Sequence, residues 1–102
     1  MKARLLPEPE EEIRLAAQWY EDRETGLGEQ FLEAIVDALA EIERHPRRFS
    51  KPPKLRSTRD IRRLLLPRFP YSIIYEIRPK EILVAAVAHV SRRPNYWRSR
   101  LK

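Results

Sequence analysis

Apolar residues recur at helical spacing in the first quarter of the chain. They fall at positions i, i+3, i+4 and i+7 and are Ile13, Ala16, Ala17 and Tyr20. This spacing places them on one face of an amphipathic helix. Pro9 suits the first helical turn because its missing N–H has no partner there, and the glutamates that follow it complement the positive end of the helix. The pattern therefore predicts a helix over about residues 9–23.

A second stretch of helical spacing follows a short segment that contains glycine. Its apolar positions are Phe31, Ile35, Ala38 and Ile42, with Leu32, Val36 and Leu39 widening the stripe. Pro46 cannot continue a helix, so we expect this helix to end near Arg44. The segment ETGLGE, residues 24–29, holds both glycines of the chain and predicts a turn. The two helices should therefore form a hairpin.

The period changes after Pro46, where β-branched and aromatic residues become frequent. Three segments have the composition of strands: IRRLLL at 61–66, YSIIYEI at 71–77 and EILVAAVAHV at 81–90. The RPKE segment at 78–81 suits a tight connection between the last two strands. The ARLL segment at 3–6 predicts one more strand, placed before the helices.

The last strand segment is apolar on both of its alternating faces. One set is Ile82, Val84, Ala86 and Ala88, and the other is Leu83, Ala85 and Val87, with His89 next in the second set. Apolar residues on both faces are typical of a strand in the middle of a sheet. The β-α-α-β-β-β order predicts an α+β fold in which a helical hairpin packs on a small, mainly antiparallel, twisted sheet. With 102 residues, 42% of them hydrophobic, we expect a single domain over residues 1–102.

Charge is distributed unevenly along the chain. The first 43 residues hold four Lys and Arg against twelve Asp and Glu, a net charge of −8, and the remainder holds seventeen against three, a net charge of +14. A basic half of this size attracts phosphate groups or an acidic protein, with a strong dependence on salt. The alternative is a solvated dipolar surface with no partner.

Several kinds of site are excluded by composition. Cysteine is absent and only two histidines occur, so we expect no disulfide, no thiolate nucleophile and no metal site. No apolar run approaches the roughly 18 residues that a membrane span requires, and the N-terminus lacks the features of a signal peptide. We therefore expect a soluble protein with no membrane partner.

The segment AHVSRRPNYWRSR, residues 88–100, carries the candidate chemistry. It mixes four arginines with His89, Tyr96 and Trp97, and no acidic residue occurs in it or after it. Two interpretations remain open for the aromatic residues, which can fold the tail back onto the sheet or anchor a target. His89 on a strand face is more often a structural, hydrogen-bonded residue than a catalyst. Because neighbours along a strand point to opposite faces, only one of Arg62 and Arg63 can share a site with the tail.

The motifs of the chain resemble a known toxin superfamily. The segments WYEDRETGLGEQFLEAI, HPRRF, RRLLLPRFPYSIIYEI and VAAVAHVSRRPNYWRSR occur in this order. Together with the order of elements, they resemble the RelE/ParE superfamily of bacterial type II toxin–antitoxin systems, whose members are often described as plasmid stabilization proteins. The resemblance covers nearly the entire chain. It implies the fold given above, a cytoplasmic location, and a cognate antitoxin that wraps the toxin in a hetero-oligomeric complex.

One branch of this superfamily, RelE-like, cleaves ribosome-bound mRNA without a metal by activating the ribose 2′-OH. The resemblance places three of its catalytic residues on Arg63, Arg92 and Tyr96. Two other basic positions of that branch fall on Leu65 and Ser72, which carry no charge. Because each lost transition-state contact can cost about 2.7–4 kcal/mol, the chain is a poor match for an endoribonuclease.

The other branch, ParE-like, binds and inhibits DNA gyrase, which requires a charged surface and no catalytic group. The HxxRRPxxW ending of the chain is more similar to this branch. We therefore expect a gyrase inhibitor without a cofactor. The alternatives are a ribosome-dependent mRNA endoribonuclease and a basic, non-toxic relative that binds nucleic acid. The residues expected at the target surface are Arg62, His89, Arg92, Arg93, Trp97 and Arg98.

Overall fold

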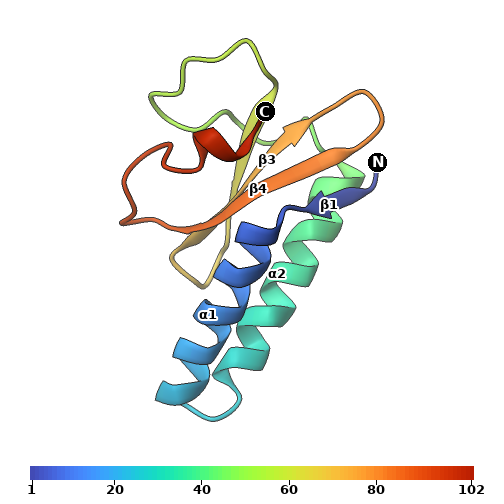
Figure 1. Ribbon diagram of the computed structural model, residues 1–102. Coiled ribbons are helices and arrows are strands. Elements are labelled where there is room, and N and C mark those ends of the chain that lie inside the picture. Colours follow the sequence, from blue (N-terminus) through green and yellow to red (C-terminus); the bar gives the residue numbers. More distant parts are fainter.

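The structure is a computed structural model that describes residues 1–102 (Figure 1). Its elements follow the order β-α-α-β-β-β that the sequence predicts. They are β1 (Ala3–Leu5), α1 (Pro7–Arg23), α2 (Leu27–Arg44), β2 (Ile61–Leu65), β3 (Tyr71–Ile77), β4 (Ile82–His89) and a short 3₁₀ helix η1 (Arg98–Arg100). The fold is thus α+β, and no helix in it is both long enough and apolar enough to cross a membrane.

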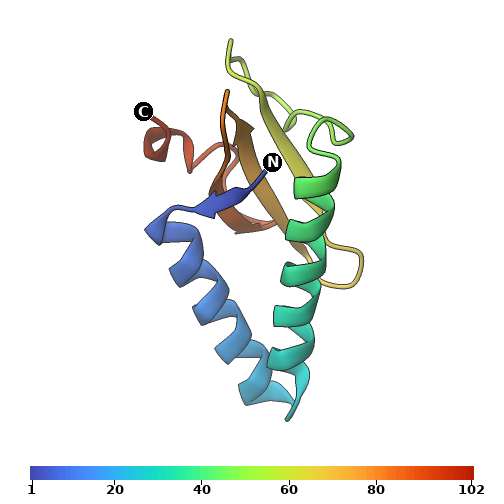
Figure 2. The ribbon, with the colours of Figure 1, turned by 90° about the vertical axis from the view of Figure 1, so that its right-hand side faces the viewer.

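The helical hairpin turns more tightly than the sequence suggests. α2 begins at Leu27, inside the segment 24–29 that was expected to be a turn. Gly26 has a left-handed φ of 90°, which a glycine adopts without strain, and the Glu21 side chain accepts the backbone N–H groups of Gly26 and Gly28. A Cβ on Gly28 would lie 2.5 Å from the Ala17 carbonyl oxygen. Glycine at this position therefore allows α1 and α2 to approach closely at their joined ends (Figure 2).

The four strands form one mixed sheet in the order β1-β4-β3-β2. β4 pairs with β3 in antiparallel fashion and β3 pairs with β2 in the same way, whereas β1 runs parallel to β4. The prediction that the last strand is central is confirmed, because β4 lies between β1 and β3. The prediction of a mainly antiparallel sheet is confirmed as well.

A β-bulge in β4 overturns the expected assignment of its faces. Ile74 of β3 pairs with Ala86 and Tyr75 pairs with Val84, so Ala85 has no partner across the strand pair. One extra residue reverses the alternation that follows it. Val87 therefore joins Ile82 and Val84 in the core beneath the helices, although strict alternation would place it with Leu83.

Two apolar clusters lie on the two faces of the sheet. The helix-side core joins the buried faces of α1 and α2 to the sheet and contains, among others, Ala16, Phe31, Ile35, Ile42, Ile73, Tyr75 and Val84. The outer core lies on the opposite face and comprises Ile61, Ile74, Leu83, Ala85, Ala86, Ala88, Trp97 and Leu101. The C-terminal segment thus folds back onto the sheet and covers part of its outer face.

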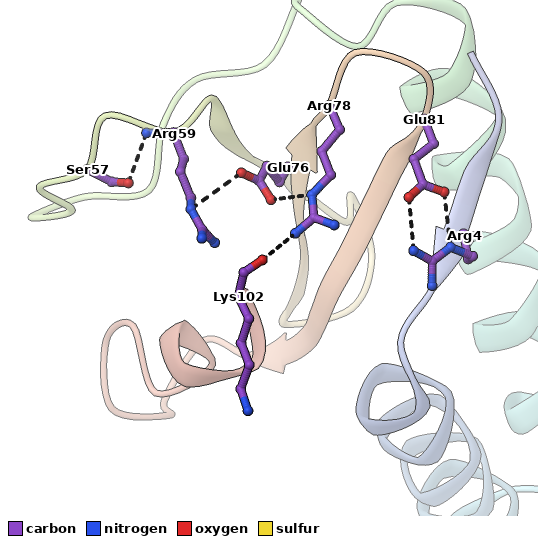
Figure 3. Close-up of polar contacts among 7 residues, drawn as sticks. All are labelled: Arg4, Ser57, Arg59, Glu76, Arg78, Glu81 and Lys102. Atoms are coloured by element: carbon purple, nitrogen blue, oxygen red, sulfur yellow. Dashed lines mark hydrogen bonds and ion pairs between the residues drawn. The ribbon is translucent and has the colours of Figure 1, made fainter.

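Polar contacts hold the end of the molecule where the loops meet (Figure 3). Glu76 of β3 is only 7% exposed and lies between Arg78, at 2.8 Å, and Arg59, at 3.7 Å. Arg78 also donates to the backbone oxygen of Lys102, and Arg4 of β1 pairs with Glu81 beside β4. These ion pairs and the hydrogen bond to Lys102 connect the last residue and the loops to the sheet.

Candidate functional site

A pocket of about 240 Å³ opens on the outer face of the sheet, and we call it the outer-face pocket. Its walls come from segments far apart in the sequence: the loop at 52–54, the three strands β2, β3 and β4, and the tail at 90–97. Ile74, Ala88 and Trp97 of the outer core lie among its lining residues. The pocket is therefore built where the tail crosses the sheet without covering it completely.

The lining of the outer-face pocket is cationic. It includes Lys54, Arg63, Arg92 and Arg93, and it contains no aspartate or glutamate. None of these four side chains takes part in an ion pair within the chain, whereas the acidic residues of the basic half, Asp60, Glu76 and Glu81, are all paired to other arginines. The positive charge of this pocket is thus not neutralised by the protein itself.

The hydroxyl of Tyr96 is occupied by a hydrogen bond to Glu12 of α1 and is not free for acid–base catalysis. Its hydroxyl donates a hydrogen bond to Glu12 Oε2, and the Arg92 guanidinium lies 3.9 Å from the centre of its ring. Burial, together with this hydrogen bond, raises the pKa of Tyr96 well above its ordinary value. A phenol with a raised pKa that already donates to a carboxylate is a poor proton donor to a leaving group.

Glu12 also joins α1 to the tail and to the open edge of β4. Its carboxylate pairs with Arg100 at 3.0 Å and accepts the backbone N–H of Val87 at 3.0 Å, and Arg100 donates to the Ala85 carbonyl. Both side chains of the pair are only 16% exposed. Sequence reasoning missed this residue, because Glu12 stands in a run of glutamates that gives it no individual signal.

His89 reaches the outer-face pocket from the end of β4. Its Nδ1 accepts the backbone N–H of Ser91 at 3.0 Å and contacts the Ser91 hydroxyl, while its ring packs edge-to-face on Tyr71. Since a nitrogen that accepts an N–H carries no proton, neutral His89 is protonated on Nε2. It is therefore arranged as a hydrogen-bond donor rather than as a general base.

Two residues expected at a target surface have structural contacts instead. Trp97 is 2% exposed and packs in the outer core, so its ring has almost no surface to offer a partner. Arg62 donates to the backbone oxygens of Arg47 and Phe49 and pairs with Asp60. Its guanidinium holds the loop that follows α2, and it does not line the outer-face pocket.

The structure does bring together the other expected residues. Arg63, Arg92, Arg93 and His89 all line the outer-face pocket with Tyr96. Arg98 is exposed on the same tail and donates to the backbone oxygen of Arg56, outside the pocket lining. The loop residue Lys54 was missed by sequence reasoning, because no periodicity connects the loop to the strands that it approaches.

The two uncharged positions that weaken a nuclease interpretation lie opposite each other. Leu65 of β2 pairs in register with Ser72 of β3. Leu65 is exposed, and Ser72 lines the outer-face pocket. At these two positions, where the resemblance to RelE-like toxins implies cations, the sheet carries a leucine outside the pocket and a serine in it.

A second hollow, of about 740 Å³, lies between α1 and the end of β4. We call it the α1 groove. Its apolar lining includes Leu15 and Trp19, which are 55% and 51% exposed, and it also reaches Tyr20, Val87 and His89. Arg23 lies over the Trp19 ring at 3.5 Å, so this indole is oriented although it faces solvent. Exposed large apolar side chains grouped in a groove are typical of a protein-binding surface.

The geometry of the outer-face pocket supports binding rather than bond cleavage. Cations and neutral donors surround it, but no lining carboxylate is present and both Tyr96 and His89 are arranged as described above. General acid–base catalysis needs a base and an acid placed at the reacting atoms. The pocket can attract and orient an anion, which is the first requirement of a charged binding surface.

Comparisons with known proteins identify the relatives of the chain. A solved structure titled "Chromosomal ParDE TA system from P. aeruginosa" shares the fold with a TM-score of 0.63 at 17% sequence identity, over 87% of this chain and 95% of that chain. A search of curated proteins found no match. The family described as "ParE toxin of type II toxin-antitoxin system, parDE" matches residues 4–94. The chain therefore belongs to the ParE toxin family of type II toxin–antitoxin systems.

Proposed function

We propose that this protein is a cytoplasmic growth inhibitor that binds DNA gyrase and that a cognate antitoxin neutralises it. Membership of the ParE toxin family supports the toxin role. The observation that carries the mode of action is the state of Tyr96, whose hydroxyl donates to Glu12 and whose pKa is raised. A toxin that binds its target needs the cations of the tail but no free acid or base, and this arrangement fits such a toxin.

The proposed contact residues for gyrase are the exposed cations near the outer-face pocket. Arg92, Arg93 and Arg98 are exposed, and His89 lies at the rim between the pocket and the α1 groove. Arginine is enriched among the residues that dominate binding energy. We leave Trp97 and Arg62 out of this set, because their side chains are occupied within the fold.

The proposed antitoxin contact is the α1 groove together with the basic tail beside it. Leu15 and Trp19 would receive apolar side chains, and Arg92, which also lines this groove, would pair with acidic ones. The basic half of the chain carries a net charge of +14, so we expect the antitoxin segment that covers it to be acidic. Binding should weaken as salt rises, because the charges at the groove rim are open to solvent.

The deciding experiment compares the purified chain in two assays, gyrase supercoiling and translation-coupled cleavage of mRNA. We expect loss of supercoiling, or trapped gyrase–DNA cleavage complexes, and intact mRNA. Expression without an antitoxin should arrest growth, and co-expression with the neighbouring antitoxin gene should restore it. Intact supercoiling combined with cleaved mRNA would reject gyrase as the target, and an absence of growth arrest would favour the non-toxic alternative.

One observation favours mRNA cleavage as a second candidate function. Arg63, Arg92 and Tyr96, the residues that correspond to RelE-like catalytic positions, all line the same pocket. Under this alternative, Tyr96→Phe should remove cleavage of ribosome-bound mRNA, because the phenol would be the acid for the leaving oxygen. Under gyrase inhibition, the same variant should keep its toxicity if it folds, which a thermal melt would verify. The variant removes only the phenol oxygen of Tyr96, and its effect on toxicity thus distinguishes the two functions.

A further inference from the structure

We propose that the outer-face pocket binds a phosphodiester group of a nucleic-acid backbone, without cleaving it. The inference goes beyond gyrase inhibition, because it concerns a direct contact with nucleic acid and does not depend on which protein is the target. Phosphate contacts fix the position of a protein on a nucleic acid and require no base-specific readout. The pocket has the charge, the neutral donors and the size that such a contact needs.

The unpaired arginines of the pocket suit the binding of a polyanion. Arg63 from β2 and Arg92 from the tail line the pocket, and neither forms an ion pair within the chain. Arg92 is stacked on the Tyr96 ring, whose hydroxyl is tied to Glu12. A planar guanidinium held by stacking is suited to bidentate recognition of phosphate oxygens, because little of its freedom remains to be lost on binding.

Neutral donors complete the pocket between the cations. Ser72 is 5% exposed, yet its hydroxyl makes no hydrogen bond within the chain and lines the pocket. The carboxamide of Asn95 is on the tail side of the same pocket. Phosphate oxygens accept hydrogen bonds from arginine, serine and asparagine alike. The Ser72 hydroxyl is not fully enclosed and opens to the pocket, so it is free to donate a hydrogen bond to a bound phosphate.

Backbone conformation singles out the same place. Lys54 and Asn95 have φ angles of 61°, and they are the only residues other than glycine with positive φ in the chain. Both line the outer-face pocket, one from the loop after α2 and one from the tail. Left-handed backbone at a lysine is unfavourable, and such strain gathers at binding sites. The two residues bring a cation and an amide from distant segments to one cavity.

The size of the pocket restricts what can enter it. At about 240 Å³ it is smaller than the roughly 300–1,000 Å³ of sites that enclose whole drug-sized ligands. A single phosphate with part of its sugar can enter while the rest of a polymer runs across the surface. Exposed Arg93 lies at the edge of the pocket and would meet the neighbouring phosphate, whereas Arg98 is bonded to the Arg56 backbone oxygen outside the pocket lining.

The test measures binding of the full chain to short fluorescein-labelled oligonucleotides by anisotropy, between about 50 and 200 mM salt. The probes are a DNA duplex, a DNA single strand and an RNA single strand, with inorganic phosphate and polyglutamate as competitors. We expect Arg63→Gln and Arg92→Gln each to weaken binding about tenfold and to lower the salt slope by about one. Arg92→Lys should restore the salt slope but only part of the affinity, since lysine lacks the planar fork.

The matched control is Arg98→Gln, which removes the same charge from the tail outside the pocket lining. It should weaken binding no more than about twofold. Ser72→Ala, which changes no charge, should weaken binding several-fold while leaving the salt slope unchanged. Circular dichroism of each variant verifies the fold.

Each further outcome decides the proposal. Equal losses for Arg98→Gln and the pocket variants would overturn it, because binding would then be diffuse attraction to a basic surface. Competition by polyglutamate at the same charge concentration as nucleic acid would also overturn it in favour of an acidic protein partner. Competition by inorganic phosphate, with shifts of the Ser72 and Asn95 amide signals in a nuclear magnetic resonance titration, would support it. A preference for DNA or for RNA would support it and identify the source of the phosphodiester.

Discussion

The two faces of the sheet are covered by different kinds of structure. On the helix side, the interlocking rings of Tyr20, Phe31, Phe69 and Tyr71 lie with their centroids 5.0 to 6.3 Å apart. On the outer side, small alanines of β4 meet the tail, which contributes Trp97 and Leu101. Two helices can cover a whole face, whereas a tail of about a dozen residues cannot. The outer face is therefore only partly covered, and the uncovered part is the cationic pocket.

This difference shows how a small domain can separate stability from function. The buried helix-side core contains no charged residue, and its one buried hydroxyl, on Tyr75, donates a hydrogen bond to the Pro46 carbonyl. The outer face carries the unpaired cations Arg63, Arg92 and Arg93. Unpaired like charges repel one another and contribute nothing to stability. These cations lie on or beside the tail, which is fixed to the fold by the packing of Trp97 and by the ion pair of Glu12 with Arg100.

The largest expected effect is a loss of stability, which tests whether the outer core is packed as firmly as the helix-side core. Phe31→Ala and Trp97→Ala should each lower the free energy of unfolding by about 3–5 kcal/mol, since both side chains are almost fully buried. Urea denaturation of both variants gives the two values. A loss below about 1 kcal/mol for Trp97→Ala would mean that the tail rests loosely on the sheet and that the two faces differ more than the burial indicates. Loss of toxicity in Trp97→Ala alone would then report a target contact.

The next effect concerns the connection between the two faces. Glu12→Gln should lower the free energy of unfolding by about 2–3 kcal/mol, because it leaves Arg100 partly buried without its counter-charge. The control is Glu11→Gln, which breaks an exposed pair with Arg14 and should change stability by less than about 0.5 kcal/mol. Equal effects for the two variants in thermal or urea denaturation would show that Glu12 does not hold the tail.

Alkaline pH should lower the free energy of unfolding through Tyr75 of the helix-side core, between about pH 10 and pH 12. Burial raises the pKa of Tyr75 to about 12, above the ordinary tyrosine value of about 10. The protonated phenol thus stabilises the folded state fully below pH 10, and this contribution is lost as pH rises through about 12. The loss should be about 2 kcal/mol, measured as urea midpoints from pH 9 to pH 12. Tyr75→Phe should be less stable at pH 9 by about 1 kcal/mol but flatter across this window. If the urea midpoints of the wild type and of Tyr75→Phe fall in parallel as pH rises, the prediction is contradicted.

Most of the fold could be predicted from the sequence, because the apolar periods change at Pro46 and stay regular within each element. The faces of β4 could not, since a bulge at Ala85 depends on pairing with β3 and leaves no mark in a strand that is apolar throughout. The predicted turn is present, but it takes only residues 24–26, because the Glu21 carboxylate accepts the N–H groups of Gly26 and Gly28 at the start of α2, a contact that the turn signal of the glycines does not reveal.

The residues of the candidate site could also be predicted only in part, because some of them depend on contacts between distant segments. The cationic tail is visible in the sequence as a segment without acidic residues, and the structure places Arg92, Arg93 and Arg63 in one pocket. The burial of Trp97 could not be decided between packing and binding, because both need an aromatic residue among arginines. The contribution of Lys54 depends on how a proline-containing loop folds over the sheet, which local pattern does not determine.

The smallest effect on stability should accompany a large effect on activity. Arg93 is exposed, lines the outer-face pocket and has no ion-pair partner, so Arg93→Gln should change the free energy of unfolding by less than about 0.5 kcal/mol. Because an arginine at a binding surface can dominate affinity, the same variant should lose most of its growth-arrest activity when expressed without antitoxin. Lys80→Gln, an equal charge change in the exposed β3–β4 turn, should retain that activity. If the two variants arrest growth equally, the unpaired charge of Arg93 on the outer face is not part of the functional surface.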